Sequence, residues 1–118
     1  MEVAGSDKRA HIVFLYELIG TALFVYSILL TNNAISIAFS LFASIIIFGS
    51  ITGGHFNPAV TLGVYIKEAQ WAKNAKWLAI VISAQLCGAM FAQLLAQATL
   101  FENEFSNIPE KSVPKLCP

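Results

Sequence analysis

Hydrophobic residues fill the chain in long runs that short polar segments separate. No Asp, Glu, Lys or Arg occurs from Leu18 to Ile66, or from Trp77 to Phe101. A helix needs about 20 apolar residues to cross a bilayer. These runs therefore predict three spans, at about residues 12–30, 34–51 and 77–101. Residues 1–11 and 102–118 are expected to be a polar N-terminal segment and a polar C-terminal tail.

The stretch between the second and third predicted spans has a different pattern. Asn57 is a favourable N-cap and Pro58 a favourable first helical residue, so a helix is predicted over residues 57–66. At about 1.5 Å per residue this helix is about 15 Å long, half the hydrocarbon thickness. Gly53 and Gly54 allow the preceding backbone to turn sharply. We expect a re-entrant half-helix whose N-terminus lies near the membrane midplane, buried in protein or lining water.

Composition supports an all-α membrane protein. The 118 residues are 57% hydrophobic and 12% charged, which is too apolar for an ordinary soluble domain of this size. The formal net charge is zero, so no nucleic-acid partner is expected. The sequence shows no grouping of His, Cys and acidic residues that would suit catalysis or metal binding. We therefore expect no enzyme activity and no cofactor.

Glu17 is an acidic residue within the first predicted span. It shares a helix face with Gly20 and Thr21. A charged group inside a membrane is costly, so Glu17 is expected to face the protein interior or water. The alternative is a side chain near the helix end that reaches the membrane interface.

The third predicted span carries two patterns. Small residues recur every four positions and suit close helix packing; they are Gly88, Ala92 and Ala96. Three glutamines, Gln85, Gln93 and Gln97, fall within about a third of the helix circumference at about 100° per residue. That face is expected to meet protein or a pore rather than lipid.

Basic residues give the orientation. Five of the seven precede the first span or separate the half-helix from the third span; they are Lys8, Arg9, Lys67, Lys73 and Lys76. Lys111 and Lys115 lie in the tail. Basic residues favour the cytoplasmic side, which predicts a cytoplasmic N-terminus. Nothing in the sequence indicates which membrane the protein occupies.

Three segments resemble the aquaporin and glycerol-facilitator family, also called the major intrinsic proteins. The sequence SITGGHFNPAVTLG at residues 50–63 resembles the first signature of that family. FLYELIGT at residues 14–21 resembles its first helix, and QLCGA at residues 85–89 resembles its third. The likeness extends over about residues 12–100.

The resemblance implies a single aquaporin-like repeat of three spans and one re-entrant half-helix, embedded in a lipid bilayer. Backbone carbonyls before the half-helix would accept hydrogen bonds from passing water, and the amide of Asn57 would donate one. Ile37 would lie at the selectivity constriction, and the imidazole of His55 would be structural. The implied pore residues are Gly53, Gly54, His55, Phe56, Asn57, Pro58, Ala59 and Ile37, and the implied supports are Glu17, Gln85 and Gly88.

The family's channel contains two inverted repeats, whereas this sequence contains one Asn-Pro-Ala triplet. A single repeat would leave the polar backbone of residues 49–57 facing lipid, which is costly. We therefore expect a half-channel for water or small neutral solutes that conducts only with a second half. The chain could be the N-terminal half of a longer channel, or pair with a separate half or a second copy. The alternative is a non-conducting structural or accessory subunit of a larger membrane assembly or oligomer.

Overall fold

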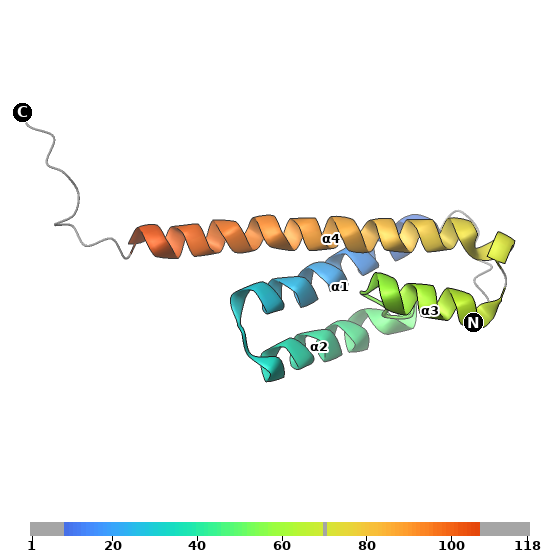
Figure 1. Cartoon of the computed structure of the whole chain (residues 1–118), viewed down its shortest axis with the longest axis horizontal. Coiled ribbons are helices and arrows are strands. Elements are labelled where there is room, and N and C mark those ends of the chain that lie inside the picture. Colours follow the sequence, from blue (N-terminus) through green and yellow to red (C-terminus); the bar gives the residue numbers. More distant parts are fainter. Residues whose placement is uncertain (1–8, 70, 107–118) are drawn as a thin grey trace, which may run out of the picture.

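A computed structural model describes residues 9–69 and 71–106. This part of the chain is helical and contains no strand. The helices are α1 (Ala10–Leu30), α2 (Ala34–Thr52), α3 (Pro58–Glu68) and α4 (Trp71–Ser106). Figure 1 shows α4 as a long rod, with α2 and α3 on one side of it and α1 crossing behind it.

The three predicted spans are confirmed as helices long and apolar enough to cross a membrane. They are Ala10–Leu30, Ala34–Thr52 and, within α4, Asn74–Phe101. Asn33 is the last residue of the connection between α1 and α2, and it caps α2. Its Oδ1 accepts hydrogen bonds from the backbone N–H groups of Ile35 and Ser36 at 2.9 and 3.2 Å. Such a cap satisfies N–H groups that have no partner within the helix.

α4 is longer than the predicted third span. It begins at Trp71, so residues 71–76, expected to belong to a polar connection, form its first turns. Lys and Ala, which make up four of these six residues, are good helix formers, so the segment is compatible with a helix although it is polar. The turn from α3 to α4 is short because Ala69, with a φ of 52°, ends α3 in the left-handed conformation.

α1 lies between α2 and α4 and contacts both. On the α2 side, the hydroxyls of Ser27 and Ser40 share a hydrogen bond at 2.6 Å. On the α4 side, Gly88 allows close approach, because a Cβ atom there would overlap the carbonyl oxygen of Leu18. The predicted small-residue stripe of α4 is buried, with Ala92 and Ala96 at 0% and 1% exposure.

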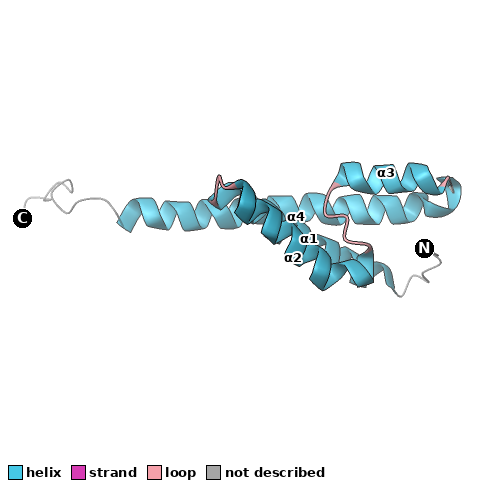
Figure 2. Ribbon diagram, turned by 90° about the horizontal axis from the view of Figure 1, so that it is seen from below, coloured by secondary structure: helices cyan, strands magenta, loops and turns pink. Residues whose placement is uncertain are grey.

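α3 packs against the N-terminal half of α4, antiparallel to it (Figure 2). Two hydrogen bonds between side chains fix its position. Gln85 Nε2 donates to Thr61 Oγ1 at 2.8 Å near the start of α3. Asn74 Nδ2 donates to Glu68 Oε2 at 2.9 Å near its end. The start of α1, the end of α3 and the start of α4 lie at the same end of the molecule (Figures 1 and 2).

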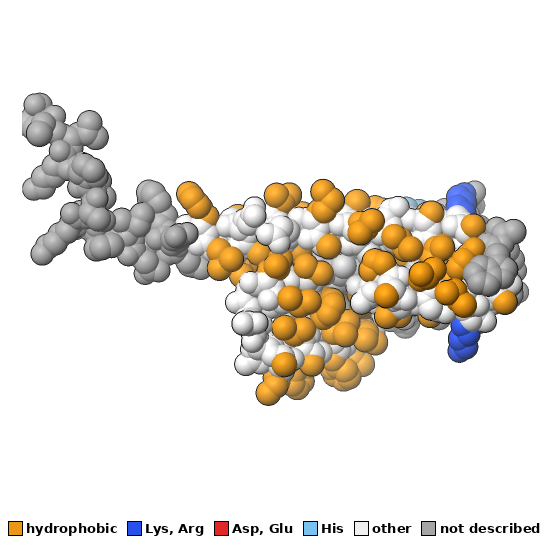
Figure 3. All heavy atoms as spheres, viewed as in Figure 1, with side chains coloured by type: hydrophobic (Ala, Val, Ile, Leu, Met, Phe, Trp, Pro, Cys, Tyr) orange, Lys and Arg blue, Asp and Glu red, His pale blue; other side chains and the backbone are white. Residues whose placement is uncertain are grey.

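Large hydrophobic side chains cover much of the outer surface (Figure 3). On α2 they include Ile35, Phe39 and Ile46, each about two-thirds exposed. Apolar surface of this extent is unfavourable in water and favourable in a bilayer. The exposed side chains and the three long helices together indicate an integral membrane protein.

Candidate functional site

Residues 53–56 form the loop between α2 and α3, and its backbone is unusual. Gly53 and Gly54 have φ values of 95° and 66°, and Phe56 has a φ of 47°. Glycine adopts this region freely, but a bulky residue does not. Packing holds Phe56 there, because its ring is 2% exposed and lies so close to Gly20 that a Cβ atom on Gly20 would overlap it. The ring of Phe56 also packs edge-on against the ring of Phe48, with the ring centroids 6.3 Å apart.

The carboxyl group of Glu17 binds this loop from α1. It is completely buried. Its Oε1 accepts hydrogen bonds from Thr52 Oγ1 at 2.6 Å and from the backbone N–H of His55 at 3.2 Å. Its Oε2 accepts from the backbone N–H of Phe56 at 2.9 Å and from Gln85 Nε2 at 2.9 Å. Four donors match the acceptor capacity of a carboxylate, which explains how an acidic residue is accommodated in the interior.

Gln85 and Thr61 extend these contacts to the other helices. The single amide nitrogen of Gln85 donates to both Glu17 and Thr61. The hydroxyl of Thr61 in turn donates to the carbonyl oxygen of Asn57 at 3.1 Å. Glu17, Thr52, Thr61 and Gln85, which we call the Glu17 network, therefore join all four helices. Each of these side chains is at most 4% exposed.

Two members of the Glu17 network were not predicted. Thr52 and Thr61 lie five residues before and four residues after Asn57, and each is an ordinary residue for its helix. The signal that could have found Thr61 is its place one turn after the cap, where its hydroxyl reaches back to the Asn57 carbonyl. The predicted support Gly88 lies nearly one turn after Gln85 and contacts α1. It is not a member of the Glu17 network.

The donors and acceptors of the loop backbone are used differently. The N–H groups of residues 53–56 all donate: Gly53 to the Gly49 carbonyl at 2.9 Å, Gly54 to Thr52 Oγ1 at 3.1 Å, and His55 and Phe56 to Glu17. The carbonyl oxygens of the same four residues accept no hydrogen bond from the described part of the chain. The loop therefore presents a set of unused acceptors.

Asn57 begins α3 as predicted. Its Oδ1 accepts a hydrogen bond from the backbone N–H of Ala59 at 2.8 Å, which is the geometry of an N-cap. Its amide nitrogen has no partner among residues 9–69 and 71–106. Asn57, Pro58 and Ala59 are all exposed. The tip of α3 thus offers a free donor next to the free acceptors of the loop.

His55 and Ile37 have other surroundings. The imidazole of His55 is half-buried and contacts Trp77 of α4 edge-on, with ring centroids 5.5 Å apart. Its Nδ1 is buried and has no partner in the described part of the chain. Ile37 is half-buried near the start of α2, about 22 Å along that helix from Thr52. The structure therefore does not bring Ile37 into the loop site.

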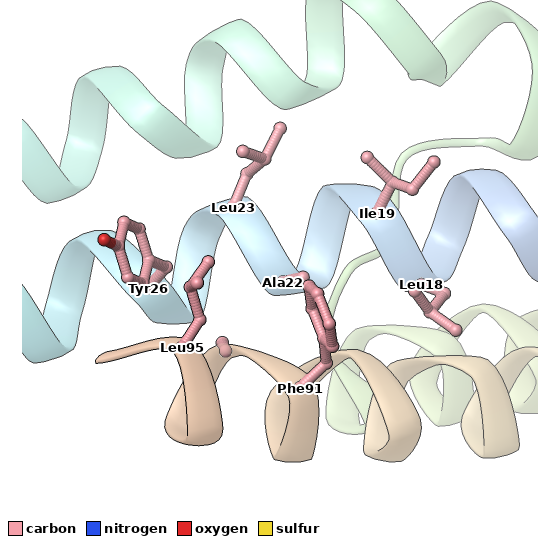
Figure 4. A pocket seen from close by; sticks show the side chains of 8 residues that line it. Leu18, Ile19, Ala22, Leu23, Tyr26, Phe91 and Leu95 are labelled. Atoms are coloured by element: carbon pink, nitrogen blue, oxygen red, sulfur yellow. The ribbon is translucent and has the colours of Figure 1, made fainter. Parts of the chain in front are cut away.

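A groove between α1 and α4 has no such polar groups. Its volume is about 130 Å³, and Figure 4 shows side chains of both helices around it. Its lining consists of Leu18, Ile19, Ala22, Leu23, Tyr26, Phe91, Ala92 and Leu95. An apolar groove of this kind does not provide the hydrogen bonds that water needs, so the loop site is the candidate for function.

Comparison with known proteins identifies a family for the chain. Residues 10–115 match the model of the major intrinsic protein family. Neither a curated protein nor a solved structure matches the chain. Members of this family are membrane channels and not enzymes. With three membrane-length helices and a match over most of its length, the chain belongs to the major intrinsic protein family, whose members form aquaporin-type channels.

Proposed function

We propose that this chain forms one side of a pore for water or small neutral solutes and conducts only with a second half. The observation that carries the proposal is the division of the loop backbone between paired donors and unused acceptors. Water entering a membrane must keep its hydrogen bonds. The carbonyl oxygens of residues 53–56 and the amide of Asn57 supply acceptors and a donor in sequence along one path.

The geometry of α3 supports a re-entrant path. α3 has 11 residues and is therefore about 16 Å long, against about 30 Å for the hydrocarbon layer. Its end lies beside the start of α4, and its start lies beside Gln85. In this proposal α3 enters and leaves on the cytoplasmic side, as the basic residues favour. The positive end of its dipole then opposes cations at the midplane.

A second half is required because the site is incomplete on one side. The tip of α3 is exposed, and the loop carbonyls have no partner in the described part of the chain. Polar backbone in contact with lipid costs several kcal/mol for each unsatisfied group. A second, oppositely inserted half-helix would cover this surface and enclose the water path.

The test is water permeability in proteoliposomes, measured by stopped-flow light scattering. Vesicles with this chain alone should shrink at the rate of empty vesicles, and vesicles that also hold a separately expressed second half of a family member should shrink faster. Asn57→Asp should abolish the gain, because Asp keeps the cap but replaces the amide donor with a negative charge. Leu15→Ala is the matched control, since Leu15 is about half exposed on α1, away from the loop.

Two results would overturn the proposal. Permeability of the chain alone above that of empty vesicles would show that a second half is unnecessary. An unchanged permeability with every second half tested, although the halves co-purify, would favour a non-conducting structural subunit. Replacing water by glycerol in the same assay identifies the solute class.

A further inference from the structure

Exposed basic side chains lie at the end of the molecule where α1 begins, α3 ends and α4 begins. They are Arg9 before α1, Lys67 in the last turn of α3 and Lys76 near the start of α4. We call these three residues the basic end. Figure 3 shows Lys and Arg side chains on the right, where α3 ends and α4 begins in Figure 1. By contrast, residues 31–33, which join α1 to α2 at the opposite end of these helices, carry no charge.

The chain does not neutralise the charge of the basic end. Arg9 and Lys67 are exposed and form no ion pair or hydrogen bond within the described part of the chain. Glu68 follows Lys67 in sequence, but it is half-buried and its Oε2 accepts a hydrogen bond from Asn74 Nδ2 at 2.9 Å. The basic end is therefore a positive surface that an anionic partner can reach.

Helix stability accounts for Lys67 but not for Arg9. Lys67 lies in the last turn of α3, where the helix dipole favours a cation. Arg9 directly precedes α1, at the positive end of that dipole, and its side chain makes no capping hydrogen bond. A cation at this position is slightly unfavourable for its own helix. An anion bound to Arg9 would offset this cost.

The basic end lies at the depth of lipid headgroups. The membrane-length segments Ala10–Leu30 and Asn74–Phe101 both begin there, so Arg9 and Lys76 lie at one boundary of the apolar layer. Trp77 follows Lys76 in sequence, and tryptophan is enriched at this boundary. Anionic lipids attract basic residues that lie next to a membrane span. The anion that suits both the charge and the depth of the basic end is therefore a phospholipid headgroup.

We propose that the basic end binds anionic phospholipids in preference to zwitterionic ones. Phosphatidylglycerol has a net negative charge and phosphatidylcholine has none, so charge distinguishes the two. Each Lys or Arg near an anionic membrane surface strengthens the attraction about fivefold. The proposal does not depend on the pore, because Asn57 and the loop carbonyls lie at the other end of α3. Lipid selectivity and water conduction can therefore succeed or fail independently.

The native tryptophans report on the basic end. Trp71 and Trp77 are the two tryptophans of the sequence, and both belong to the first two turns of α4. Bromine atoms on a lipid acyl chain quench tryptophan fluorescence on contact. In phosphatidylcholine vesicles, a small fraction of brominated phosphatidylglycerol should quench more than the same fraction of brominated phosphatidylcholine. Both leaflets have the same composition, so the result does not depend on the orientation of the chain.

Two double variants separate the basic end from net charge. Arg9→Gln/Lys67→Gln should lower the preference for brominated phosphatidylglycerol about fivefold or more. Lys111→Gln/Lys115→Gln removes the same charge from the tail and should leave the preference unchanged. Circular dichroism should give the same helix content for both variants, because neither changes the Glu17 network. Equal quenching of the wild type by the two brominated lipids, or a preference that Arg9→Gln/Lys67→Gln retains, would overturn the proposal.

A competition experiment distinguishes a lipid from a soluble anion. Inorganic phosphate added at constant ionic strength should leave the preference unchanged, because it cannot match the local concentration of headgroups at the membrane surface. Raising the ionic strength with sodium chloride should weaken the preference, since exposed charges are screened by salt. Loss of the preference on adding phosphate would overturn the choice of a lipid, and a preference insensitive to salt would overturn its electrostatic basis.

Discussion

The two sides of the loop at residues 53–56 differ in how their polar groups are used. Toward α1 and α2, every N–H group of the loop has a partner: two donate to Gly49 and Thr52 of α2, and two to the buried carboxyl of Glu17 on α1. Toward the tip of α3, the carbonyls have no partner in the described part of the chain, and Asn57, Pro58 and Ala59 are exposed. We call the side whose N–H groups are all hydrogen-bonded within the chain the finished side of the loop. The side with the free carbonyls and the exposed tip of α3 is the unfinished side.

This difference separates the polar groups that contribute to folding from the polar groups that are available to a ligand. A buried polar group without a partner costs free energy, so the finished side contributes to folding. The unfinished side adds no stability and costs stability in lipid. Groups left unpaired next to a rigid support are therefore best explained by a ligand or a second half that completes them. The variants below act on one side or the other.

Glu17→Ala should have the largest effect, because it removes the acceptor of four hydrogen bonds at once. Two backbone N–H groups, the Gln85 amide and the Thr52 hydroxyl would lose their shared partner in the interior. We expect the free energy of unfolding to fall by at least about 3 kcal/mol. Unfolding in mixed micelles, followed by circular dichroism, measures it. A loss no larger than that of Leu15→Ala would contradict the role of Glu17 in holding the loop.

Gly88→Ala should come next, with Gly63→Ala as its matched control. A Cβ atom at Gly88 would overlap the backbone carbonyl of Leu18, whereas a Cβ atom at Gly63 meets nothing within 4 Å. The first change should cost about 1–3 kcal/mol because α1 and α4 must separate. The second should stabilise the isolated chain by up to about 1 kcal/mol through helix propensity. The same micelle titration tests both, and equal effects would show that α1 and α4 pack less closely at Gly88.

Thr61→Val should have a smaller effect on the finished side. Val has nearly the shape of Thr but cannot accept the hydrogen bond from Gln85 Nε2 or donate to the Asn57 carbonyl. Since Gln85 retains its bond to Glu17, we expect a loss of about 1–2 kcal/mol. Thr61→Ser keeps the hydroxyl and should lose less. If the two variants were equally stable, the hydroxyl would not be what fixes α3 to α4.

The sequence predicts the helices well because each leaves a local signal. Long apolar runs mark α1 and α2, and Asn57 followed by Pro58 marks the start of α3. Its least accurate boundary is the start of α4, where lysines and an asparagine suggest a connection but form helical turns. Polarity reports where a segment lies relative to the membrane better than it reports whether the segment is helical.

The site was predictable in part. The resemblance to a family indicated Glu17 and Gln85 as supports, and the structure brings them within 2.9 Å. Thr52 and Thr61 were missed because threonine in an apolar helix is common and its role depends on partners far away in the sequence. The orientation of the loop carbonyls is equally non-local, since Glu17, some 38 residues before the loop in sequence, sets it through the N–H groups. Such contacts appear only once the helices are placed.

Asn57 belongs to both sides, and its variants have the smallest effect on stability. Asn57→Ala removes the cap of α3, in which Oδ1 accepts from the Ala59 N–H, and should lower the free energy of unfolding by about 1 kcal/mol. Asn57→Asp keeps a capping oxygen and places a negative charge at the positive end of the helix, so it should cost less than Asn57→Ala. Both replace the free amide donor. If the unfinished side serves a ligand, the more stable Asp variant should lose water permeability with a second half as fully as the Ala variant, and a permeability that follows stability would mean that Asn57 acts through the cap alone.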